Sequence, residues 1–241
     1  MKNIIGYIKF IDNDFIDDFF QLQNLWLSDI HTFTSNSEEQ EDNLIDDKFE
    51  GKLDKLSLDM PAFITCFTEI TSDSLDETGV LKKSISNALI NCEEKLGKNR
   101  DFVFIPLVNM QSVLADIRDA ELGKTTGCLS NSPIFSRKVQ YINDYKNTMD
   151  KLEAKCLEQN SRVSKERVGK GMLAIKSSKY QIQNEFRIGL VIAERDSDFY
   201  ARWKSQKGLS LHFVHPINFA IKKFKRQELK KLNIKQMANQ I

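Results

Sequence analysis

The sequence predicts one α+β domain over residues 1–241, and three features of the chain support this prediction. Segments with the two-residue period of strands occur near both ends, whereas segments with the helical period lie mainly between them. This order favours an α+β fold over a regularly alternating parallel sheet. With 241 residues, of which 41% are hydrophobic, the chain is also long enough to bury a core without disulfides or metals.

The first half of the chain is expected to hold four strands and two helices. Strands are predicted at residues 4–10, 24–30, 62–70 and 101–109. The last of these is apolar on both faces, which is typical of a central strand. Helices are predicted at residues 82–96 and just after Asp14, the latter with Phe15, Phe19 and Phe20 on one face. Residues 31–48 are acidic and lack any period, so we expect a long surface loop there.

The second half is expected to alternate between helices and short strands. Helices are predicted at residues 111–122 and 145–158, and a basic helix at residues 225–232. Residues 125–133 have the composition of a turn, and Gly169 and Gly171 mark another break. Strands are predicted at residues 139–144, at residues 179–193 and, as one or two strands, at residues 208–221.

Composition restricts where the protein works. The apolar runs are too short to span a bilayer, and the N-terminus lacks the pattern of a signal peptide, so a cytoplasmic protein with reduced cysteines is expected. Net charge is only +1, yet residues 1–100 hold 10 basic and 20 acidic residues, and residues 101–241 hold 25 and 14. This difference either reflects where helices fall or describes a basic surface for RNA or for an acidic partner.

Several common chemistries lack their motifs. The chain has no glycine-rich phosphate loop, no GxSxG turn and no HExxH pair. His212 and His215 would lie on opposite faces of a strand, and the acidic run at residues 38–50 does not have EF-hand spacing. No metal site is therefore predicted.

One polar row stands out in KYQIQNEFRIGLVIA, residues 179–193. On a strand, Gln183 and Glu185 would lie about 6 to 7 Å apart on one face, with Arg187 next along the same row. A carboxylate facing a cleft can stabilise positive charge at an anomeric carbon, and a neighbouring amide can orient an acceptor. The same pattern also fits a water-facing antiparallel sheet in which Arg187 pairs with an acid across the sheet.

Short motifs along the chain resemble those of a group of small bacterial proteins of unknown or toxin-like function. These motifs are GYIKF, NLWLSDI, DDKFEG, ITCFTEI, VQYIND and KYQIQNEFRIGLVI, and they cover roughly residues 5–230. The closing QNEFR element is also similar to the Gln-x-Glu or Glu-x-Glu element of ADP-ribosyltransferases. That resemblance implies an α+β fold of bent, mainly antiparallel sheets with flanking helices and with NAD bound between the sheets.

The resemblance to ADP-ribosyltransferases also implies roles for individual residues. Glu185 would be the catalytic carboxylate and Gln183 the acceptor-orienting residue. Contacts to NAD would come from Tyr7 and Lys9 on the first strand, where the family usually has Arg or His, and from Thr65 and Thr68 on a middle strand in place of Ser-Thr-Ser. A lysine can contact a pyrophosphate as a point charge.

The resulting expectation is an NAD-dependent toxin or abortive-infection effector that modifies a nucleic acid or a protein. The basic second half favours RNA or DNA as the acceptor, and an antitoxin or phage protein is an expected partner. A second hypothesis is a non-catalytic binding module of a phage-defence system, acting through Lys222, Lys223, Lys225 and Arg226. A third is a nuclease that holds a metal with Asp46, Asp47, Glu50 and Glu185.

Overall fold

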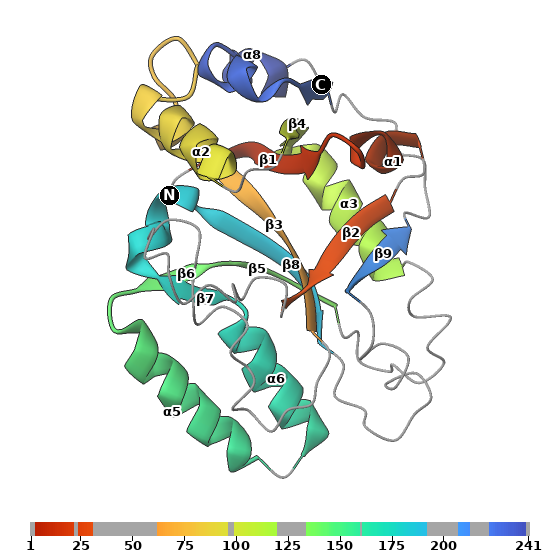
Figure 1. Ribbon diagram of the computed structural model, residues 1–241, viewed down its shortest axis with the longest axis vertical. Coiled ribbons are helices and arrows are strands. Elements are labelled where there is room, and N and C mark those ends of the chain that lie inside the picture. Colours follow the sequence, from red (N-terminus) through yellow and green to blue (C-terminus); the bar gives the residue numbers. More distant parts are fainter. Residues whose placement is uncertain are drawn as a thin grey trace.

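The computed structural model of the chain is a mixed α+β structure with a mostly antiparallel sheet and several helices (Figure 1). It describes residues 3–21, 24–30, 62–95, 99–119, 134–159, 161–191, 207–212 and 222–239. The predicted acidic loop at residues 31–48, the turn at residues 125–133 and the end of the predicted strands beyond residue 212 lie outside these residues.

An eight-stranded sheet forms the centre of the molecule. Its strands are β1 (Ile4–Asp12), β2 (Asn24–Asp29), β3 (Ala62–Thr71), β4 (Arg100–Pro106), β5 (Ile134–Lys138), β8 (Glu185–Val191), β9 (Gly208–His212) and β10 (Lys222–Phe224). They follow the order β10-β4-β1-β3-β2-β9, and β8 joins β3 to β5 on the other edge of β3. Each of these pairs is antiparallel, whereas the separate β6 (Gln140–Ile142) and β7 (Ile175–Ser177) pair in parallel.

The sheet forks along one edge of β3. Residues from Thr68 onward pair with β1, whereas Phe63 and Ile64 on the same edge pair with β2. Beyond Ile8, β1 leaves β3 and continues beside β4, so the edge of β3 at residues 65–67 has no partner strand among the described residues. Figure 1 shows the result, with β1 lying across the upper end of β3.

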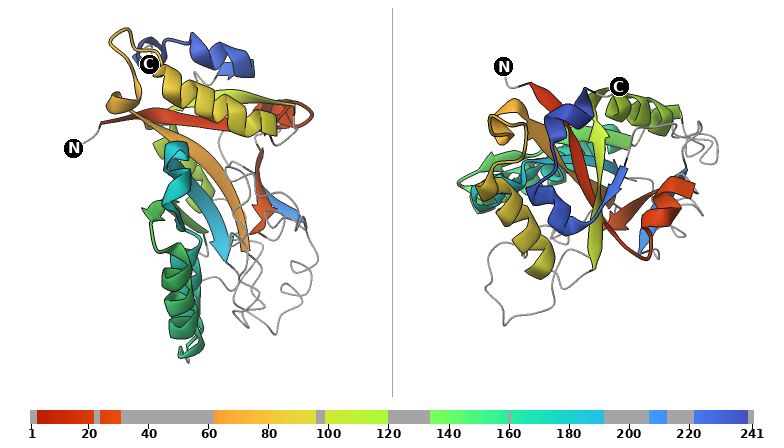
Figure 2. Two further views of the ribbon diagram at one scale, coloured as in Figure 1. Left: turned by 60° about the vertical axis from the view of Figure 1, so that its left-hand side comes forward. Right: turned by 90° about the horizontal axis from the view of Figure 1, so that it is seen from above.

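Helices cover both faces of the forked sheet (Figure 2). They are α1 (Ile16–Gln21), α2 (Lys83–Lys95), α3 (Leu107–Asp119), α5 (Tyr145–Leu157), α6 (Arg162–Met172) and α8 (Ile234–Ala238), with the short 3₁₀ helices η3 (Ser72–Ser74), η4 (Ser178–Gln183) and η5 (Arg226–Lys230). One core cluster lies between the sheet and helices α1 and α3, and a second lies under α2, η5 and α8. Tyr7 belongs to the first cluster and Ile8 to the second, as the two-residue period of β1 requires.

Most predicted elements are present, with changed boundaries. The first three strands and the helices at residues 82–96 and 145–158 are confirmed. The fourth strand ends at Pro106 and helix α3 begins at Leu107, four residues before the predicted start. The basic terminal helix is instead a 3₁₀ turn followed by a short helix, and α6 together with β5 and β7 was not predicted.

The largest difference concerns the predicted strand at residues 179–193. Its first part is the 3₁₀ helix η4, and the strand itself begins at Glu185. Asn184 separates the two with a φ of 42°, a left-handed conformation that ends the helix. Within the part of the chain that the structure describes, no helix has the length and apolar character needed to cross a membrane.

Candidate functional site

A buried cluster of three charged side chains lies at the start of β8. Glu185 is the first residue of the strand, Arg187 follows two positions later on the same face, and Lys176 lies in the middle of β7. Their exposed fractions are 7%, 1% and 5%. Charges this deeply buried must be paired, because isolated ions are strongly unfavourable outside water.

The two carboxylate oxygens of Glu185 have different partners. Oε2 accepts hydrogen bonds from Nε and Nη2 of Arg187, at 2.9 and 2.7 Å. Oε1 accepts a hydrogen bond of 2.7 Å from Nζ of Lys176, and the same ammonium donates at 2.9 Å to Oε1 of Gln183. Lys176 therefore links the two side chains that sequence reasoning selected as catalytic.

The surroundings of Glu185 keep it ionised. Burial by itself raises the pKa of the carboxyl group, but the charges and hydrogen bonds of Lys176 and Arg187 outweigh burial and lower the pKa to about 2. Arg187 is fixed in turn by a 2.9 Å hydrogen bond from Nη1 to the carbonyl of Leu173, at the end of α6. The carboxylate is thus negative at neutral pH and held in one orientation.

Backbone contacts explain why Glu185 occupies this place. The Nδ2 group of Asn184 donates to the carbonyl of Glu69 on β3 at 2.5 Å, which attaches the turn before β8 to the central strand. The backbone N–H of Glu185 donates to the hydroxyl of Tyr141 on β6 at 2.8 Å. Burial, with the negative charge of Glu185, raises the pKa of Tyr141, so its hydroxyl stays neutral.

The geometry differs from the prediction in one important way. We expected Gln183 and Glu185 to share one face of a continuous strand that lines a cleft, whereas Gln183 ends η4 and Glu185 begins β8. They meet through Lys176, which sequence reasoning missed because a single lysine in IKS carries no signal by itself. Arg187 pairs along its own strand with Glu185, although the alternative reading placed its partner across the sheet.

The residues predicted to contact NAD do not all lie on the same face as Glu185. Thr68 pairs directly with Glu185 in the β3–β8 register and therefore shares its face. Thr65 pairs with Ile188, on the opposite face. Tyr7 and Lys9 lie on that opposite face as well, since Tyr7 belongs to the first core cluster and the ammonium of Lys9 lies 5.0 Å from the centre of the Phe67 ring.

Lys9 occupies the fork of the sheet. Its ammonium donates to the hydroxyl of Thr65 and, at 3.5 Å, to the carbonyl of Cys66. That carbonyl lies in the stretch of β3 that lacks a partner strand among the described residues, so the lysine supplies a donor where a strand N–H is missing. Burial lowers the pKa of Lys9 to about 8.

Tyr7 is better explained by packing than by binding. Its side chain is 4% exposed, and its ring centre lies 5.1 Å from that of Phe186. Burial and the nearby charge of Glu69 raise the pKa of its hydroxyl to about 12. The tyrosine is therefore a neutral member of the core.

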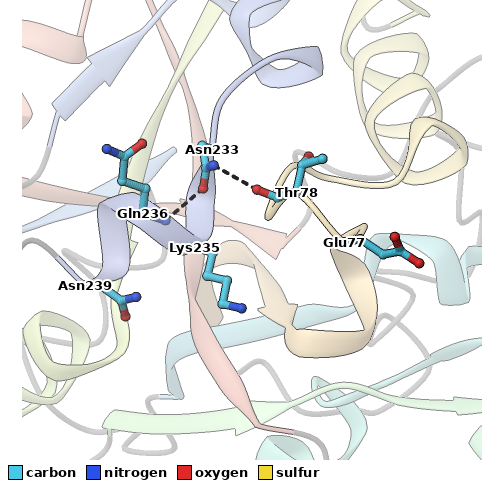
Figure 3. Close-up of a pocket in the computed structure, with 6 residues that line it drawn as sticks. All are labelled: Glu77, Thr78, Asn233, Lys235, Gln236 and Asn239. Carbon is cyan, nitrogen blue, oxygen red and sulfur yellow. Dashed lines mark hydrogen bonds between the residues drawn. The ribbon is translucent and has the colours of Figure 1, made fainter.

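A metal centre has no support among the described side chains. No group of three or more His, Cys, Asp or Glu side chains there could hold an ion. Asp46, Asp47 and Glu50 of the nuclease hypothesis lie outside the described residues, and both carboxylate oxygens of Glu185 already accept hydrogen bonds, from Lys176 and Arg187. An open hollow of about 550 Å³, between the turn at Thr78 and helix α8, contains none of the predicted site residues (Figure 3).

Comparison of the chain with protein-family models, with curated proteins and with solved structures gives no match.

Proposed function

We propose that this protein is an NAD-dependent ADP-ribosyltransferase-like enzyme that acts as a toxin or abortive-infection effector on a nucleic acid or protein acceptor. The observation that carries the proposal is the ionised carboxylate of Glu185, which shares the ammonium of Lys176 with the amide of Gln183. A fixed carboxylate can stabilise the positive charge that develops at an anomeric carbon, and a neighbouring amide can orient the acceptor.

In the proposed reaction, the bond between C1′ of the ribose and the nicotinamide nitrogen breaks, and nicotinamide leaves with the electron pair. Positive charge develops on the ribose, where the carboxylate of Glu185 stabilises it. The acceptor then bonds to C1′ and loses a proton to water. Gln183 orients the acceptor, and no oxidant or metal is needed to balance the step.

Oε1 is the oxygen of Glu185 that we assign to the ribose. Arg187 holds Oε2 with two hydrogen bonds, whereas Lys176 makes a single hydrogen bond to Oε1. A ribose hydroxyl can replace that single bond while Arg187 still fixes the carboxylate. The ammonium released from Oε1 keeps its hydrogen bond to Gln183.

We assign the pyrophosphate of NAD to Lys9 and the hydroxyl of Thr65. Lys9 contacts the hydroxyl of Thr65, the carbonyl of Cys66 and the ring of Phe67, all of which are neutral, and no carboxylate of the described residues pairs with it. Because Lys9 and Glu185 project from opposite faces of the sheet, the dinucleotide must pass the edge of β3 at the fork to reach both. This requirement makes the fork part of the proposed binding site.

The test is transfer of label from isotopically labelled NAD into a fresh cell lysate, separated into protein and nucleic-acid fractions. Wild type is expected to transfer label, and the labelled fraction identifies the acceptor class. Glu185→Asp, which keeps the charge but withdraws it by one methylene group, is expected to lower transfer by at least about tenfold. Glu166→Asp, at a buried glutamate of α6, is the matched control and is expected to retain activity.

Folding is checked by thermal denaturation before each assay, so that loss of structure is not mistaken for loss of chemistry. If folded wild type neither transferred label nor released nicotinamide, the proposed reaction would be overturned. Equal rates for wild type and Glu185→Asp would instead remove Glu185 from the reaction.

A further inference from the structure

The C-terminal segment formed by β10, η5 and α8 carries a dense positive charge. Residues 222–239 contain six lysines and one arginine against a single acid, Glu228. All six lysine residues are exposed, and they are Lys222, Lys223, Lys225, Lys230, Lys231 and Lys235. Because the whole chain has a net charge of only +1, this segment is much more basic than the rest of the molecule.

Most of this charge is not neutralised within the protein. Lys225 pairs with Asp101 at 2.8 Å, and Lys223 makes a longer contact of 3.6 Å with Asp17. The other four lysines have no carboxylate partner in the described parts of the chain. Four exposed cations are thus available to an external anion.

The backbone that carries these lysines is anchored in the core. Leu229 and Ile234 are fully buried in the cluster under α2. The ring of Phe224 stacks on Phe102, with centres 5.3 Å apart, and Asn233 caps α8 by accepting the N–H of Gln236 at 2.8 Å. The positive side chains are therefore presented by packed elements.

The side chains around the lysines favour a polyanion as the ligand of this segment. The exposed large hydrophobic residues of the described chain are Phe15, Trp26, Val108, Leu157 and Ile182, and none lies in this segment. Amphipathic helices that lie at a membrane surface insert an apolar face, and the centre of a protein interface is enriched in aromatic residues. This segment packs its apolar side chains against the second core cluster and exposes lysines, which suits the evenly spaced phosphates of a nucleic acid.

Polar groups beside the lysines add hydrogen bonds that a phosphate or base can use. Figure 3 shows Lys235, Gln236 and Asn239 around the open hollow next to Asn233, with Glu77 on the opposite wall. Amide side chains contact both phosphate oxygens and base edges in protein–nucleic acid complexes. The hollow thus continues the basic surface.

We propose that β10, η5 and α8 form a surface that binds the phosphate backbone of a nucleic acid. None of its lysines contacts Glu185 or Lys9, so the proposal stands without the NAD chemistry. If the acceptor of the proposed transferase is a nucleic acid, this surface would bind that acceptor to the enzyme.

The test measures binding to a fluorescein-labelled single-stranded RNA of about 20 nucleotides, by fluorescence anisotropy and without NAD. The test variant neutralises three lysines that have no ion pair, as Lys230→Gln, Lys231→Gln and Lys235→Gln together. The matched control removes the same charge from exposed lysines of α5, as Lys146→Gln, Lys151→Gln and Lys155→Gln. Helix α5 lies at the opposite end of the molecule from α8 (Figure 1).

We expect wild type and the α5 variant to bind with similar affinity, and the C-terminal variant to bind at least about tenfold more weakly. Between about 50 and 200 mM salt, the slope of log affinity against log salt should fall by about 2, because three phosphate contacts to a single strand are lost. Equal weakening by both variants would overturn the proposal, since it would show a general effect of net charge. No binding of RNA, or binding only to vesicles of anionic lipid, would also overturn it.

Discussion

The carboxylate of Glu185 can be buried because a different cation pairs with each of its two oxygens. Arg187 comes from the same strand and Lys176 from β7, nine residues earlier, so two different strands contribute. Removing one partner from such a group leaves an uncompensated charge, which costs more than the ion pair itself contributes. Glu185 is consequently a structural residue as well as the candidate catalytic one.

Glu185→Gln should destabilise the protein by about 3 to 5 kcal/mol at neutral pH, because Lys176 and Arg187 would remain buried without an anion. We had expected the polar row to face a cleft, where such a change would have little effect on stability. The free energy of unfolding from urea titration checks this prediction. A loss below about 1 kcal/mol would show that water already reaches the cluster.

The same variant should also change the pH dependence of stability. The pKa of Glu185 is about 2 in the folded protein and near 4.5 in the unfolded chain, so its contribution is complete above pH 4.5 and is lost as the pH falls toward 2. Wild type should thus lose more stability than Glu185→Gln on acidification from about pH 5 to about pH 3. Parallel losses in the two proteins would contradict the low pKa.

Lys9 allows stability and binding to be separated. Burial lowers its pKa to about 8, whereas an unfolded lysine titrates near 10.5, so the unfolded chain binds more protons between these values. Wild type should therefore gain stability as the pH rises from about 7 to about 9.5, and Lys9→Met should lack this gain.

The Lys9→Met variant should be at least as stable as wild type at pH 7 and should release nicotinamide from NAD more slowly, as a product assay would show. A stable variant with full activity would exclude Lys9 from the NAD site.

Single elements show what the sequence could and could not specify. Strands β1, β3 and helix α5 were predictable because apolar residues recur with one clear period in each. The stretch at residues 179–193 alternates just as clearly, yet its first five residues belong to a 3₁₀ helix. The alternation of Tyr180 and Ile182 had no bearing on the sheet, because Tyr180 is buried beside Lys176 whereas Ile182 is 37% exposed.

The candidate site was predictable only in part, because the period of a strand gives which residues share a face but not which strands pair. Glu185 and Arg187 are two positions apart on a real strand, so their shared face followed from the period. Lys176 could not be found, because its contact depends on the parallel pairing of β6 with β7. Thr65 and Thr68 lie three positions apart on the strand that was predicted at residues 62–70, so their opposite faces already followed from the period of two, and the NAD assignment overlooked this.

Asn184 provides a test at the junction between η4 and β8. Its φ of 42° is unfavourable for most residues with a Cβ atom, and glycine adopts it freely. Asn184→Ala and Asn184→Gly both lose the hydrogen bond to Glu69, so their difference isolates the backbone conformation. We expect the glycine variant to be the more stable of the two by about 1 kcal/mol in urea unfolding. Equal stability would mean that the junction relaxes to another conformation.

Across the whole molecule, folding partly cancels the charge asymmetry of the sequence. Lys138 pairs with Glu69 and Lys223 with Asp17, so acidic residues of the first half meet basic residues of the second. Four C-terminal lysines have no such partner among the described residues, and the remaining asymmetry is concentrated there. The basic surface thus results from which lysines the fold leaves unpaired.

The α5–α6 pair should open more readily than the sheet. The two helices pack on each other through a small cluster whose buried members, among the side chains that the structure describes, are Cys156 and Met172, whereas β3 is buried along nearly its whole length. Figure 2 shows the pair extending away from the sheet. Elements with few buried apolar contacts unfold locally at lower free energy than the core, so amides of α5 should exchange hydrogen at lower urea concentration than those of β3 and β8.

Mass spectrometry of exchanged peptides resolves these elements. Helix α2, which packs on the second core cluster, is the internal comparison. If α5 and β3 lost protection together, the helical pair would instead belong to the same cooperative unit as the sheet, and the Arg187 hydrogen bond to Leu173 would be the direct link between them.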